Sequence, residues 1–204
     1  MSTITLYTHP MSRGRIARWM LEECGADYDT VLLEYGTTMK ARDYLAINPM
    51  GKVPALVDGD AIVTEIAAVI LWLADRFPEK HLAPALNTPE RAAYYRWITF
   101  VSGPLEALMN DTMLGQFGKP SVAGYGNPGD TLDTLEALIG ERDFIIGDHF
   151  TAADLLLAAF LGFYMKFKMI EPRPAFVRYV ELHDARPAAK RAEAIDEKLM
   201  ADAQ

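Results

Sequence analysis

The stretch NPMGKVPALVDGDAIVTE, residues 48–65, decides the fold. In it, two short apolar runs flank the turn sequence Asp58-Gly59-Asp60, and an Asp-Gly turn between β-prone runs predicts a β-hairpin. Pro54 stands immediately before the first run, although proline has no backbone N–H and removes a ladder hydrogen bond inside a sheet. We interpret this proline as a sign that the backbone of Val53 stays open for another partner.

The residues around the hairpin have the element order of a thioredoxin-type domain. A β-α-β opening with a short crossover predicts parallel strands. A short helix, the hairpin and a helix capped by Thr64 then follow. The segments are strands at 2–7 and 28–33, a helix at 13–24 ended by Gly25, and helices at 40–47 and from Thr64 to about 76.

The second half of the chain has a helical pattern throughout. Residues 77–88 contain several breakers and are typical of a linker, so we expect domains at 1–80 and 88–204. Thr151 and Asp154 predict a capping box at the start of one helix. The expected elements are 89–117 with a kink at Gly103-Pro104, a Gly- and Pro-rich mobile loop at 115–129, and helices at 130–142, 151–168, 174–184 and 187–202.

Composition excludes several classes of function. The chain of 204 residues is half hydrophobic and carries a net charge of -8, which argues against nucleic acid or an anionic membrane as a partner. The single cysteine, Cys24, excludes disulfide exchange by a Cys pair, and the four histidines are too scattered to predict a metal site. Residues 155–165 form the longest apolar run, which is too short to span a membrane. We expect a soluble, cytoplasmic protein without a metal.

Two backbone positions predict a ligand of a particular chemistry. If Pro54 is cis, as in thioredoxin-type domains, Val53 can pair through its N–H and C=O with an extended peptide; the alternative is a trans turn proline. Glu65 begins a helix, where it can hold a ligand's ammonium group while helix N–H groups hold its carboxylate, or can simply balance the helix dipole. A peptide with an amino-acid-like end and a thiol in its middle fits both positions.

The chain resembles the cytosolic glutathione S-transferases of the bacterial serine or theta-like type. The resemblance covers nearly the whole chain and rests on LYTHPMSRGRIARWMLEECG, the 48–65 segment, ILWLADRFPE, the helical second half and the FTAAD capping box. It implies a thioredoxin-like domain followed by an all-helical domain, glutathione as co-substrate, and a homodimer. It implies a transferase that conjugates the glutathione thiolate to hydrophobic electrophiles. The alternatives are a non-catalytic interaction module and a glutathione-dependent isomerase, dehalogenase or peroxidase.

The resemblance also assigns the glutathione contacts. Val53, followed by cis Pro54, would hold the cysteine, and Glu65 with the backbone N–H of Ile66 would hold the γ-glutamyl end. The family usually has serine or threonine after this glutamate, so Ile66 lacks one hydroxyl contact, a loss of about 1 kcal/mol or about fivefold in affinity. Candidates for the glycyl carboxylate are Lys40 and Lys52, unless both are simply solvated.

Family members activate the thiol with a side chain near the end of the first strand. Ser12 is our choice, assisted by the helix N-terminus and by Arg13 or Arg15. Ser12 could instead only cap the helix. Tyr7 and His9 are the rivals, although Tyr7 lies six residues before Arg13.

The electrophile is expected to occupy an apolar site built from both domains. Methionine and aromatic side chains suit varied hydrophobic substrates, although such side chains are more often part of a core. The candidates are Met11, Met109, Met113, Phe117 and Tyr164.

Overall fold

The computed structural model describes residues 4–202, and the chain forms two compact units. One unit contains the residues up to His81 together with those from Arg186 onward, and the other is Leu82–Ala185. This division differs from the expected domains 1–80 and 88–204, because the last helix belongs with the first unit. The described residues contain no helix that combines the length and apolar character needed to cross a bilayer.

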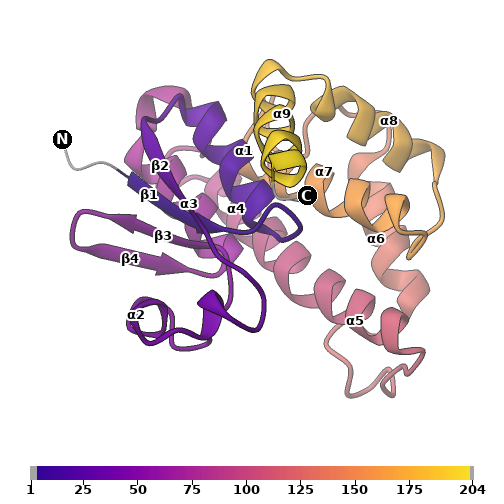
Figure 1. The fold of residues 1–204 in the computed structure, drawn as a ribbon. Coiled ribbons are helices and arrows are strands. Elements are labelled where there is room, and N and C mark those ends of the chain that lie inside the picture. Colours follow the sequence, from indigo (N-terminus) through magenta and orange to yellow (C-terminus); the bar gives the residue numbers. More distant parts are fainter. Residues whose placement is uncertain (1–3, 203–204) are drawn as a thin grey trace. The chain divides into compact units, whose positions relative to one another are not determined.

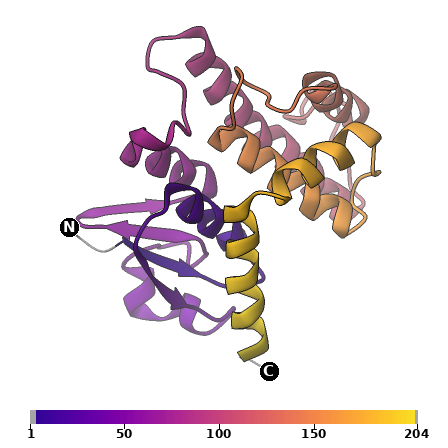
Figure 2. The same ribbon diagram turned by 90° about the horizontal axis from the view of Figure 1, so that it is seen from above.

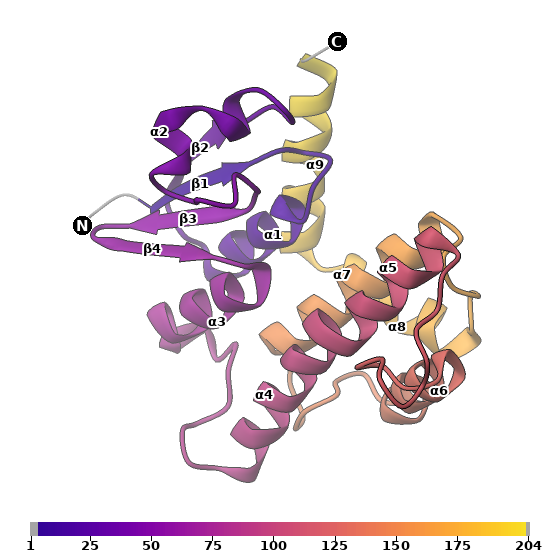
Figure 3. The same ribbon diagram turned by 90° about the horizontal axis from the view of Figure 1, so that it is seen from below.

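The first unit is a thioredoxin-like domain with a four-stranded mixed sheet in the order β2-β1-β3-β4 (Figures 1 and 3). β1 pairs in parallel with β2 and antiparallel with β3, and β3 pairs antiparallel with β4. This arrangement confirms the predicted β-α-β opening and hairpin. The elements are β1 (Ile4–Thr8), α1 (Gly14–Cys24), β2 (Tyr28–Leu32), η1 (Thr38–Lys40), α2 (Arg42–Leu45), β3 (Ala55–Asp58), β4 (Ala61–Thr64), α3 (Ile66–Arg76) and η2 (Pro78–Lys80).

The two faces of the sheet carry different side chains. Ile4, Leu6 and Thr8 alternate as the buried residues of β1, as the two-residue period of a strand requires. Tyr7 points to the other face, where it joins an apolar cluster with Tyr44 and Val53. The remaining members of this cluster are Leu33, Met39, Ile47 and Ala55.

The last helix, α9 (Pro187–Asp202), packs along α1 (Figure 2). Arg18 of α1 and Asp196 of α9 form a buried ion pair, and Arg186 makes a bidentate ion pair with Glu23, with N–O distances of 2.7 and 2.8 Å. These contacts explain why the C-terminal residues belong to the first unit.

The second unit is helical, as predicted. The expected kink at Gly103-Pro104 is a π-helical turn between two α-helices, and the Thr151–Asp154 capping box is present. Asp111 stabilises the loop at 115–127. Its Oδ2 accepts hydrogen bonds from the Tyr125 hydroxyl at 2.6 Å and from the Gly118 N–H at 3.2 Å. The elements are α4 (Pro89–Phe100), the π-helix η3 (Val101–Leu105), α5 (Glu106–Leu114), α6 (Pro128–Ile139), α7 (Ala152–Lys166) and α8 (Pro174–Asp184).

Two element boundaries differ from those expected from the sequence. The helix expected at 40–47 is interrupted by Ala41, whose extended backbone separates η1 from α2. Thr64 does not cap α3, because it is the last residue of β4 and Glu65 occupies the N-cap position. Residues 2 and 3 of the first expected strand lie outside the described part of the chain.

Candidate active site

The sheet brings four chain segments to one edge. β1 and β2 are parallel, so the residues that follow both strands, beginning at His9 and at Leu33, emerge at the same edge. The β1–β3 register ends at the pair Tyr7–Ala55, which places Val53 at that edge too. Ala55 also pairs with Thr64, so Glu65 follows at the same edge. The residues predicted from separate motifs therefore share one end of the sheet.

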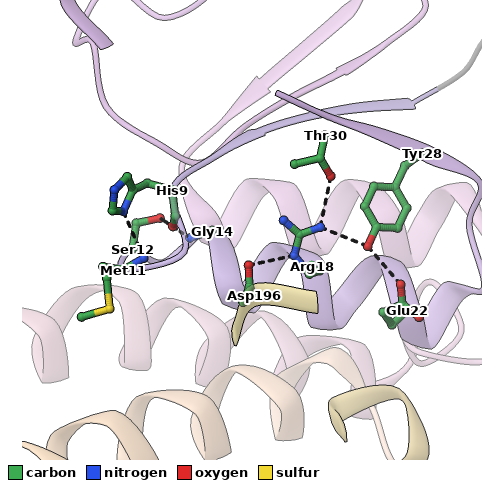
Figure 4. Close-up of polar contacts among 9 residues, drawn as sticks. All are labelled: His9, Met11, Ser12, Gly14, Arg18, Glu22, Tyr28, Thr30 and Asp196. Atoms are coloured by element: carbon green, nitrogen blue, oxygen red, sulfur yellow. Dashed lines mark hydrogen bonds and ion pairs between the residues drawn. The ribbon is translucent and has the colours of Figure 1, made fainter. Parts of the chain in front are cut away.

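Ser12 lies in the turn between β1 and α1, with its hydroxyl held on two sides (Figure 4). Its Oγ donates to the His9 carbonyl at 2.6 Å and accepts a hydrogen bond from the Gly14 N–H at 2.9 Å. Arg13 is the N-cap residue of α1, so Ser12 is not the cap itself but accepts the N–H of the first helical residue from one position earlier. To donate to a ligand, its hydroxyl has to turn its single proton away from His9, while the Gly14 N–H keeps the oxygen in place.

Gly14 allows this turn to lie close to the sheet. A Cβ at Gly14 would come within 1.8 Å of Thr8 Oγ1 and 3.0 Å of Ser12 Oγ. Only glycine fits at this position without displacing its neighbours. The close approach places the positive end of the α1 dipole beside Ser12.

His9 supports the turn through both ring nitrogens. Its Nδ1 accepts a hydrogen bond from the Met11 N–H at 3.0 Å, so the neutral ring carries its proton on Nε2. Nε2 lies 3.6 Å from a carboxylate oxygen of Glu34. The ring nitrogen that could accept a thiol proton is thus already bonded, and this geometry favours a supporting role for His9 over a role as base.

Tyr7, the other rival, lies on β1 within the apolar cluster. Its ring centroid is 5.6 Å from that of Tyr44, and the side chain is partly buried. It shares this cluster with Val53, which keeps Tyr7 at the same edge of the sheet as the Ser12 turn.

The Val53–Pro54 peptide bond is cis. The preceding segment is fixed through the Lys52 carbonyl, which accepts hydrogen bonds from the Tyr44 hydroxyl at 2.5 Å and the Asn48 side chain at 2.8 Å. Val53 itself lies beyond the last paired residues of β1 and β3. Its backbone is therefore placed where an added strand would continue the sheet.

Glu65 has an unusual backbone conformation at the start of α3. Its φ of 68° is in the left-handed region, which a residue with a side chain adopts at a cost of about 1–2 kcal/mol. The side chain is exposed, whereas Ile66 is only 6% exposed and packs into the core. At Ile66, only the backbone N–H is therefore available to a ligand at the helix N-terminus.

The candidate cations differ in their surroundings. Lys40 Nζ donates to the Met50 carbonyl at 2.8 Å, so it lies over the turn that leads to Val53. Lys52 and Arg13 have exposed side chains at this edge. No group of three or more His, Cys, Asp and Glu side chains that could hold a metal ion occurs within residues 4–202.

Glu34 and Tyr35 also lie at this edge, although no sequence motif predicted them. The Tyr35 hydroxyl donates to the Met11 carbonyl at 3.2 Å, and its ring packs on His9 with centroids 4.7 Å apart. A signal did exist: segments that follow two neighbouring parallel strands meet at one edge of a sheet.

The apolar candidates fall into two groups. Met109 and Tyr164 are each 2% exposed and belong to the core of the helical unit. Met11, Met113 and Phe117 are exposed. Only these three present a surface to a substrate, because the burial of Met109 and Tyr164 leaves them little exposed area.

The fold defines a class of protein: a thioredoxin-like domain followed by a helical domain. Family models of the glutathione S-transferase N-terminal and C-terminal domains match residues 11–76 and 129–191. Glutathione S-transferase 3 of Zea mays is 31% identical over 94% of this chain and 93% of its own length.

Solved structures agree with these matches. A glutathione transferase from Methylococcus capsulatus is 28% identical and superposes with a TM-score of 0.81 over 96% of this chain and 99% of its own. A sphingomonad glutathione S-transferase in complex with glutathione is 26% identical, with a TM-score of 0.79 over 95% and 98% of the two chains. The chain therefore belongs to the glutathione S-transferase family of enzymes.

Proposed function

We propose that the protein binds glutathione at the edge of the sheet and transfers its thiolate to a hydrophobic electrophile, with Ser12 as the thiol activator. One observation carries the proposal: the strand register brings the Val53 backbone, the Ser12 hydroxyl and the start of α3 at Glu65 to one edge. An extended peptide on Val53 would there lay its central thiol beside the start of α1.

Binding would use three contacts. The glutathione cysteine would pair with the backbone of Val53 beside cis Pro54, and the γ-glutamyl end would meet Glu65 and the N–H of Ile66. The glycyl carboxylate would meet Lys40 or Lys52, with Arg13 adding positive charge near the thiol. The buried Ile66 side chain offers no hydroxyl, so we expect an affinity about fivefold below that of a site with serine there.

Catalysis would rest on stabilisation of the thiolate. The Ser12 hydroxyl would turn from the His9 carbonyl to donate to sulfur, and the positive end of α1 would add to this effect. A fall of two in the thiol pKa corresponds to about 2.7 kcal/mol of preferential stabilisation. The bound thiolate would then attack the electrophile, forming a carbon–sulfur bond as the leaving group departs with the bonding electrons.

The electrophile is proposed only as a chemical class, an apolar small molecule. Met11 directly precedes Ser12 and is 59% exposed, so we infer that it contacts an apolar substrate; Met113 and Phe117 are the candidates on the helical unit. A serine or theta-like subtype and a homodimer are also part of the proposal. Sedimentation of the purified protein tests the dimer.

An assay panel tests the reaction. An activated aryl halide, a hydroperoxide and an isomerisable substrate are each supplied with glutathione. Conjugation of the aryl halide, abolished in the absence of glutathione, is the expected result. If the protein binds glutathione but turns over only the hydroperoxide, the proposed conjugation is wrong and the activity is that of a peroxidase.

A further inference from the structure

We propose that Tyr35 is a positioning residue that acts through Ser12, an inference that rests on the proposed thiol site. Tyr35 follows β2 and reaches across to the turn that follows β1. Its hydroxyl and its ring make separate contacts there, with the Met11 carbonyl and with the His9 ring.

Both backbone polar groups of Met11 are held by side chains. The N–H donates to His9 Nδ1 at 3.0 Å, and the carbonyl accepts from the Tyr35 hydroxyl at 3.2 Å. A peptide unit is planar, so fixing the Met11 carbonyl also fixes the direction of the Ser12 N–H. Tyr35 thereby limits the backbone rotation that would carry the Ser12 side chain away from its position.

The same residues cross-brace the turn. The His9 ring packs on Tyr35 at an interplanar angle of 55°, and His9 Nε2 faces Glu34. The adjacent residues Glu34 and Tyr35, which follow β2, thus contact His9 from two directions. The His9 carbonyl in turn accepts a hydrogen bond from the Ser12 hydroxyl. The path from Tyr35 to Ser12 is therefore a short series of direct contacts.

The electrostatic surroundings keep the Tyr35 hydroxyl a donor. Partial burial raises its pKa, and the nearby Arg13 charge opposes this rise. The hydroxyl therefore stays protonated at neutral pH. Since its proton is directed to the Met11 carbonyl, the geometry supports action through the turn in preference to direct contact with a thiolate.

A double-mutant cycle tests the inference. Tyr35→Phe removes the hydroxyl and keeps the ring, and Ser12→Ala removes the hydroxyl through which Tyr35 is proposed to act. Tyr95→Phe is the matched control at another exposed tyrosine. For each variant we would measure the pKa of bound glutathione from thiolate absorbance. The Kd of S-methylglutathione, which has no ionisable thiol, separates activation from binding.

We expect Tyr35→Phe to raise the bound thiol pKa by about 0.5, about a threefold loss of thiolate preference. The Kd of S-methylglutathione should stay within about twofold of wild type, because its backbone contacts remain. In the Ser12→Ala background the same substitution should have no further effect on the thiol pKa, since effects transmitted through one group do not add. Tyr95→Phe should match wild type.

Amide hydrogen exchange provides a readout that needs no ligand. In Tyr35→Phe, the Met11 and Gly14 amides should exchange severalfold faster than in wild type, because the bonds to His9 and Ser12 are less well held. Unchanged exchange in Tyr35→Phe would overturn the inference whatever the glutathione result. An added rise in thiol pKa in the Ser12→Ala background would also overturn it, in favour of direct contact.

These outcomes separate the two proposals. A wild-type protein that binds no glutathione, or binds it with an unshifted thiol pKa, contradicts the proposed function. A wild type with a lowered thiol pKa that Tyr35→Phe leaves unchanged contradicts only the role of Tyr35.

Discussion

Arg18 of α1 and Asp196 of α9 form an ion pair of 2.9 Å in which each side chain is only 1% exposed (Figure 4). The same guanidinium donates from Nη1 to the Thr30 hydroxyl at 3.1 Å and to the Tyr28 hydroxyl at 3.3 Å. One arginine thus connects α1, β2 and the C-terminal helix. The helix that carries Arg18 begins beside Ser12, so this network supports the element on which the proposed site is built.

Removal of one partner should be strongly destabilising. We expect Asp196→Ala to lower the free energy of unfolding by about 3–5 kcal/mol, because it leaves the Arg18 charge buried without its counter-ion. Urea denaturation measures the change. Glu197→Ala, at the exposed next position of α9, is the control and should stay within about 0.5 kcal/mol of wild type. Equal effects of the two substitutions would contradict the assigned role.

Asp154 should be the corresponding key residue of the helical unit. Its carboxylate accepts hydrogen bonds from the Ile145 N–H, the Thr151 N–H and hydroxyl, and the Tyr179 hydroxyl, at 2.7–2.8 Å. Asp154→Ala leaves these buried donors unsatisfied, and we expect a loss of about 3 kcal/mol or more. Thermal denaturation is the measurement, and Asp148→Ala, at a fully exposed carboxylate, is the control. A loss below about 1 kcal/mol would contradict this role of Asp154.

Gly14 should not tolerate a side chain. A Cβ there meets Thr8 Oγ1 at 1.8 Å, so Gly14→Ala has to displace the start of α1 from β1, at a cost of about 1–3 kcal/mol. Gly129 in α6 is the matched control, because no atom lies within 4 Å of a Cβ at that position. Gly129→Ala should be neutral or stabilising by up to about 1 kcal/mol. Chemical denaturation measures the stability of both variants. Equal stability would contradict the close approach of Gly14 to Thr8.

Cys24 should make the free energy of unfolding depend on pH in the alkaline range. Burial, followed by the charges of Glu23 and Glu79, raises the pKa of its thiol from 9.0 to about 12. The folded state therefore holds this proton more tightly than the unfolded chain does. The stabilisation is fully present below about pH 9 and is lost as the pH rises toward 12.

Urea midpoints at a series of alkaline pH values check this prediction. Other groups titrate in the same range, so wild type is compared with Cys24→Ala at each pH. Wild type should lose more stability than the variant above about pH 9. Parallel losses in the two proteins would show that Cys24 does not titrate differently on folding. Native Cys24, being 1% exposed, should also resist alkylation.

Local patterns predicted most of the fold. The Asp58-Gly59 turn, the Gly25 helix stop and the Thr151–Asp154 capping box each depend on neighbours in sequence, and all three occur as predicted. The position of α9 could not be predicted in this way. It depends on Arg18 and Asp196, which are 178 residues apart and whose pairing no local pattern indicates.

The site was predicted in part, for the same reason. Val53, cis Pro54 and Glu65 follow from the hairpin and the helix after it. Glu34 and Tyr35 lie in a segment without a motif, and only the parallel pairing of β1 with β2 brings them to His9 and Met11 in the turn after β1. Thr64 was expected as a cap from its residue type, but strand pairing with Ala55 takes precedence over that preference.

The central claim is that Ser12 stabilises the thiolate of glutathione bound at Val53. The most direct test is the pH titration of thiolate absorbance with glutathione bound to wild type and to Ser12→Ala, with calorimetry to confirm binding. We predict that both proteins bind with Kd values within about threefold, and that the thiol pKa is about two lower in wild type alone. Equal thiol pKa values in the two proteins would contradict the claim and favour Tyr7. Absence of binding at millimolar glutathione would contradict the glutathione site itself.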